Sequence, residues 1–96
     1  METIEKINDI GRDNSYIEEM IKVLDLSIAD RKRAYKLELA FENDLGFYSK
    51  NIANIAAELD RFKAEKAMRQ MQLMENNKIL LTMLTLEVTR NKYRLN

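Results

Sequence analysis

The chain has 96 residues, with sixteen basic and sixteen acidic side chains and no Cys, His, Pro or Trp. Without Cys and His there is no disulfide, no thiol or imidazole for catalysis, and no ordinary zinc ligand set. No segment approaches the roughly 20 apolar residues of a membrane helix, and the N-terminus lacks a signal-peptide pattern, so we expect a cytoplasmic protein with no membrane partner.

The composition favours helix throughout, because 46% of residues are hydrophobic, 33% are charged and only two are glycine. We predict a single all-α domain over residues 1–96. It has a short N-terminal helix and then a long antiparallel, coiled-coil-like helical hairpin, assembled into an oligomeric bundle. The abundance of Ile, Asn and Lys is compatible with an AT-rich source such as a phage or mobile element.

The first predicted element is a helix over residues 2–10, in which Ile4, Ile7 and Ile10 are spaced by three. Gly11 then indicates a helix end. Ser15, with Glu18 three residues later, has the pattern of a capping box and predicts the start of the next helix.

The second predicted element is a helix over residues 15–43. Val23, Leu26 and Leu37 widen its apolar surface beyond one line, so we expect it to need more than one neighbour. Gly46 suits the C-terminal end of this helix. Phe47 and Tyr48 follow as an apolar lid, and Ser49 or Asn51 could cap the third helix.

The third predicted element is a helix over residues 48–93. Its first part carries a coiled-coil seam at Ile52, Ile55, Ala56, Leu59 and Phe62. The apolar phase is then expected to shift to Ala67, Met68, Met71 and Met74. Asn76 and Asn77 mark a position where the helix could break, and the alternation within residues 79–89 leaves a strand paired between subunits as an alternative.

Charge is distributed unevenly along the chain. Residues 1–30 carry three bases and eight acids, residues 31–60 five of each, and residues 61–96 eight bases and three acids. The net charges are therefore −5, 0 and +5. This gradient favours antiparallel pairing, either within one chain or between copies.

We expect a non-enzymatic helical protein–protein interaction module, such as a small inhibitor, adaptor, chaperone or assembly factor. Its partner would be a further copy, another protein, or both, held by helix–helix association. The residues expected to form this association seam are Ile17, Ile21, Leu24, Ile28, Met71, Met74, Leu80 and Leu84.

Nucleic-acid binding is an alternative function, because two basic clusters each include a tyrosine that could stack on a base. The zero net charge argues against a dedicated nucleic-acid binder. The contacts would come from Arg31, Arg33, Lys36, Arg90, Lys92 and Arg94.

A second alternative is a small helical enzyme or anion-binding protein that clamps its ligand with arginines. The candidates are Arg31, Arg33, Arg61 and Arg69. No residue spacing resembles the Glu-x-x-His motif of di-iron bundles. A carboxylate site for a hard metal could form from Glu38, Glu42, Asp44, Glu58 and Asp60, but we expect no enzyme activity, metal or cofactor.

Overall fold

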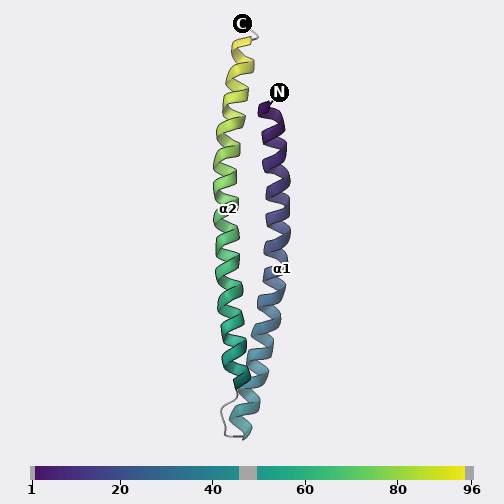
Figure 1. The fold of residues 1–96 in the computed structure, drawn as a ribbon, viewed down its shortest axis with the longest axis vertical. Coiled ribbons are helices and arrows are strands. Elements are labelled where there is room, and N and C mark those ends of the chain that lie inside the picture. Colours follow the sequence, from purple (N-terminus) through teal and green to yellow (C-terminus); the bar gives the residue numbers. More distant parts are fainter. Residues whose placement is uncertain (1, 46–49, 95–96) are drawn as a thin grey trace.

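The computed structural model describes residues 2–45 and 50–94, and it consists there of two long helices lying side by side (Figure 1). Helix α1 spans Glu2–Leu45 and helix α2 spans Lys50–Arg94. They run antiparallel and form a rod with dimensions of 78 × 15 × 14 Å. The N- and C-terminal ends therefore lie at the same end of the rod, where α2 extends beyond α1 (Figure 1). The predicted all-helical, elongated architecture is confirmed.

The predicted short N-terminal helix is wrong, because α1 passes through Gly11 without interruption. The boundaries 2–10 and 15–43 are therefore wrong, and Ser15 is an exposed residue inside the helix rather than its cap. Glycine in a helix interior costs about 1 kcal/mol relative to alanine. A continuous helix offsets this cost by keeping Ile10 and Ile17 on the same side, both against α2.

Helix α2 is also continuous, with no break at Asn76 and Asn77 and with helix throughout residues 79–89. The threonines that suggest a strand bond back into their own helix. The hydroxyls of Thr82, Thr85 and Thr89 donate to the backbone carbonyls of Lys78, Leu81 and Thr85, at 3.0, 2.8 and 2.9 Å. These local bonds accommodate threonine in a helix, and the strand alternative is wrong.

The chain reverses between Leu45 and Lys50. The predictions for Gly46, Phe47, Tyr48 and Ser49 fall on residues 46–49, outside the described residues. Asn51 lies within α2, and its side-chain amide donates to a carboxylate oxygen of Glu38 at 3.5 Å.

One line of side chains on each helix faces the other helix, and we call these two lines the inner seam. Successive members are alternately four and three residues apart, which is the spacing of a coiled coil, and all of them are buried or half-buried. In α1 the line includes Ile7, Ile10, Asn14, Ile17, Ile21, Leu24, Ile28, Arg31 and Tyr35. In α2 it includes Ile52, Ile55, Leu59, Phe62, Lys66, Arg69, Leu73, Asn76, Leu80 and Met83.

Four polar contacts between the helices define their register. They are Glu38 with Asn51, Arg31 with Glu58, Asp25 with Lys66, and Asn14 with Asn77. In each pair the two residue numbers add up to 89 or 91. The register is therefore the same from the turn to beyond the middle of the rod.

The predicted shift of phase after Phe62 is wrong. The inner seam continues with the same spacing through Lys66 and Arg69, whereas the exposed side chains of Met68 and Met71 lie outside it. Polar residues at seam positions conceal the continuity of the pattern. They also make the core thin. Among the described residues, the buried hydrophobic side chains are Ile17, Leu24, Ile28, Ile52 and Leu59, each still 6–8% exposed.

Candidate interaction surfaces

Many large apolar side chains lie on the described surface of the hairpin. Fifteen are exposed, against five hydrophobic residues in the core. Monomeric soluble proteins expose single apolar residues freely, but contiguous apolar patches usually mark an interaction site. The arrangement of these side chains therefore indicates where a partner could bind.

One side of the hairpin carries the first of these surfaces. Tyr16, Met20 and Val23 of α1 line a groove of about 480 Å³ together with Phe62 and Glu65 of α2. A second groove of about 300 Å³ continues on this side and is lined by Asp13, Tyr16, Ile17, Arg69, Gln72, Glu75 and Asn76. We call this side, next to the inner seam, the acidic face.

An apolar line follows the acidic face along α1. Its spacings of four and three repeat those of the inner seam, and its central positions are the less apolar Ser27, Asp30 and Ala34. Because this line has helical spacing and is not covered by α2, it has the pattern that a further helix recognises. We call it the outer stripe, and it consists of Tyr16, Met20, Val23, Leu37 and Phe41.

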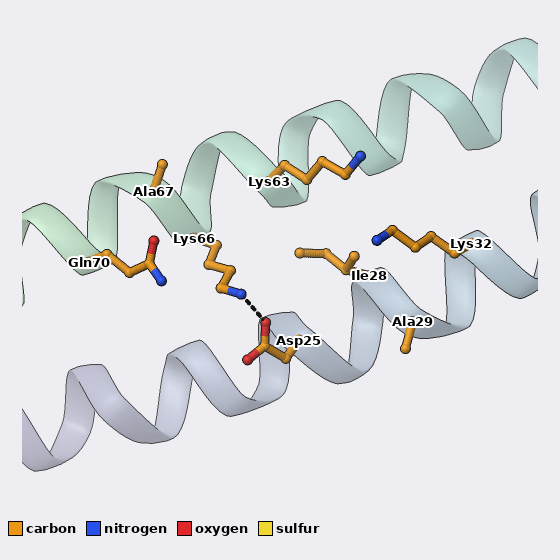
Figure 2. Close-up of a pocket in the computed structure, with 8 residues that line it drawn as sticks. All are labelled: Asp25, Ile28, Ala29, Lys32, Lys63, Lys66, Ala67 and Gln70. Carbon is orange, nitrogen blue, oxygen red and sulfur yellow. Dashed lines mark ion pairs between the residues drawn. The ribbon is translucent and has the colours of Figure 1, made fainter.

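The opposite side of the hairpin, which we call the lysine face, has a groove of about 430 Å³ (Figure 2). Lys66 approaches from α2 and pairs with Asp25 of α1 at 2.5 Å. Figure 2 shows Lys32 and Lys63 extending toward each other from opposite helices. Within the described part of the chain, neither has a carboxylate partner. Two positive charges are therefore left without counterions in one groove.

A second apolar area lies on the lysine face near the chain termini. Gly11 of α1 and Leu80 and Leu84 of α2 contribute to a groove of about 520 Å³ there. We call this area the open-end patch. It consists of the exposed residues Ile4, Met74, Leu81, Leu84 and Val88.

The two faces carry different charges. Among described side chains flanking the inner seam, the acidic face has six carboxylates and two bases, a net charge of −4. The lysine face has three carboxylates and four bases, a net charge of +1. The acidic-face groups are Asp9, Asp13, Asp30, Glu58, Glu65 and Glu75 with Lys6 and Arg61. The lysine-face groups are Glu18, Asp25 and Asp60 with Lys22, Lys32, Lys36 and Lys63.

The structure divides the residues predicted to form the association seam. Ile17, Ile21, Leu24 and Ile28 pack in the inner seam against α2 of the same chain. Leu80 is half-buried in that seam. Met71 is exposed outside the inner seam, and Met74 and Leu84 are exposed members of the open-end patch.

The two predicted basic clusters do not form one surface. Residues 31–36 lie toward the turn, whereas residues 90–94 lie at the opposite end of the rod (Figure 1). Arg31 is half-buried in the inner seam, and the hydrogen bond that its guanidinium donates to the Asp30 carboxylate raises the pKa of Arg31. Arg33, Lys36 and Lys92 are exposed, Arg90 pairs with Glu87 at 3.6 Å, and the side chain of Arg94 lies outside those described.

The predicted arginine clamps do not converge either. Arg61 lies over the ring of Phe62, with 5.7 Å between the guanidinium carbon and the ring centroid. Arg69 is in the inner seam and donates to Gln72 at 3.3 Å, whereas Arg33 points away from the seam on α1.

The described residues include no group of three acidic side chains suited to a metal ion. Neither described helix meets the length and apolarity needed to cross a membrane.

Sequence reasoning indicated extra apolar surface at Val23 and Leu37 but did not define the outer stripe, and it missed the pair of Lys32 and Lys63. The signal was present, because continuing the Ile52, Ile55, Leu59 spacing without a shift assigns Lys66 and Arg69 to the seam. The same unshifted spacing leaves Met68, Met71 and Met74 outside the inner seam.

No protein-family model matches this sequence, and comparisons with curated proteins and with solved structures give no match either.

Proposed function

We propose that this protein is a non-enzymatic helix–helix interaction module that associates with further copies of itself. The observation that carries the proposal is the excess of exposed over buried large apolar side chains among described residues, fifteen against five. A thin two-helix core supplies little stability by itself. Burying a further apolar line against another helix adds about 25 cal/mol per Å² of apolar surface removed from water.

A second copy fits this surface for two reasons. The outer stripe has the same spacing as the inner seam, so a helix of the kind this chain supplies can pack against it. The zero net charge of the chain means that copies meet without overall repulsion. Adaptors, assembly factors and small inhibitors often act through such helical surfaces, and the proposal places this chain in that broad class.

The outer stripe can be tested by changing two of its members. Val23 and Leu37 are 61% and 67% exposed, so Val23→Ser with Leu37→Ser removes apolar surface without disturbing the core. We expect sedimentation velocity to show a shift of the double variant toward monomer by about tenfold in dissociation constant.

The matched control is Leu26→Ser with Met71→Ser. These residues are 73% and 64% exposed but lie on the outer edges of the hairpin, away from both faces. We expect the control to associate as the unaltered chain does. A control that weakens association as strongly as the stripe variant would contradict the assignment of the stripe.

A further inference from the structure

We infer that the copies associate heterologously, with the acidic face of one hairpin packed against the lysine face of the next. The inference rests on the proposed self-association and adds which surfaces meet. Its occupant is a second copy of this chain, and the argument is charge complementarity between two described faces.

The charges of the faces favour this arrangement. A two-fold symmetric contact through the outer stripe would set one acidic face of net charge −4 against another. Like charges brought together across an interface are unfavourable and exclude wrong partners. A contact between opposite faces instead sets the acidic face of net charge −4 against a face of net charge +1.

Particular side chains on the two faces are suited to each other. Lys32 and Lys63 extend into one groove from opposite helices, and neither has a carboxylate partner among the described side chains (Figure 2). Glu65 and Glu75 border the grooves of the acidic face beside Tyr16, and no ion pair holds them within the described chain. Each set thus lacks the counterion that the other provides.

Both faces also carry apolar surface. The acidic face has the outer stripe on α1, and the lysine face has the open-end patch, formed by Ile4 of α1 and four residues of α2. Apolar burial can therefore supply affinity, while the charges select which faces meet. A heterologous contact leaves one face of each kind free, so the assembly grows into a ring or an open array rather than stopping at a dimer.

Charge reversal on one face at a time tests the inference. The first variant is Lys32→Glu with Lys63→Glu, which makes both faces acidic. The second is Glu65→Lys with Glu75→Lys, which weakens the acidic face. We expect each variant alone to lose self-association by about tenfold or more, and an equimolar mixture to recover it because opposite faces again meet.

The control for net charge is Lys78→Glu with Lys92→Glu. These lysines lie on the outer edge of α2, and the change in net charge equals that of the first variant. We expect this control to retain self-association. Its mixture with the second variant should give smaller assemblies. A molecule of the second variant binds the acidic face of a control molecule through its unaltered lysine face, but its own altered acidic face then binds no further copy.

Light scattering and circular dichroism of each sample provide the readout. If the first variant associates as well as the unaltered chain, or if the mixture fails to recover assemblies, the heterologous arrangement is wrong although self-association stands. If the unaltered chain is itself monomeric, the proposed function fails and this inference fails with it.

Discussion

At the residue scale, Gly11 occupies a position that does not need glycine. It lies inside α1, and a Cβ built there meets no other atom within 4 Å. Gly11→Ala should therefore stabilise the hairpin by about 0.5–1 kcal/mol, because alanine loses less conformational entropy in a helix. Urea unfolding followed by circular dichroism measures this change.

The same variant distinguishes the structure from the sequence-based expectation. The sequence predicts a helix end at Gly11. Glycine at a helix end commonly takes a left-handed conformation, in which alanine would be strained and would destabilise the protein. A loss of stability in Gly11→Ala would thus argue for two helices in place of continuous α1.

Asn14 is the buried polar residue of the inner seam, with 9% of its surface exposed. Its Nδ2 donates to Oδ1 of Asn77 at 3.0 Å, and its own Oδ1 has no partner in the described structure. Asn77→Ala should cost about 1–3 kcal/mol, because the buried amide group then loses its acceptor.

Asn14→Leu in the Asn77→Ala background should restore this stability, because a leucine at the seam needs no hydrogen bond. Thermal unfolding of both single variants and the double variant gives the coupling energy. Additive effects in the cycle would show that the two amides act independently, contrary to the observed contact.

At the scale of the elements, Leu24 and Leu26 provide a matched pair on α1. Leu24 is 6% exposed in the inner seam, and Leu26 is 73% exposed. Leu24→Ala should cost about 2–4 kcal/mol by opening a cavity between the helices, whereas Leu26→Ala should change stability by less than about 0.5 kcal/mol. Equal effects in chemical denaturation would mean that α1 packs with a different face toward α2.

The sequence predicts the helices better than it predicts their ends. Apolar spacing at Ile17, Leu24 and Ile28 correctly identifies the packed side of α1, because burial of that side is what stabilises the helix. Gly11 misleads because the cost of a single glycine is smaller than the gain from one uninterrupted seam. Local signals for a helix end are weak whenever packing continues on both sides of them.

The seam of α2 was harder to predict for a different reason. Lys66 and Arg69 occupy seam positions, where their long aliphatic parts pack while their charged ends reach polar partners. A search for apolar residues passes over both and finds the exposed methionines instead. The two faces escaped prediction because they depend on this register, which places Lys32 and Lys63 in the same groove.

At the scale of the whole molecule, the opposed charges of the chain segments become neighbours. The acidic first part of α1 lies beside the basic part of α2, with ion pairs such as Asp25 with Lys66 between them. Exposed pairs of this kind are worth only about 0–1 kcal/mol each, so they select the antiparallel orientation more than they stabilise it. The apolar faces that remain outside then determine how the hairpin behaves toward other molecules.

The most direct test of this account is the mass of the unaltered protein in solution as a function of its concentration. The chain has a mass of 11.3 kDa. We expect a light-scattering mass above that value, which rises with concentration as the acidic and lysine faces of different copies meet. A folded protein that remains at 11.3 kDa up to about millimolar concentration, the range of weak association, would contradict it.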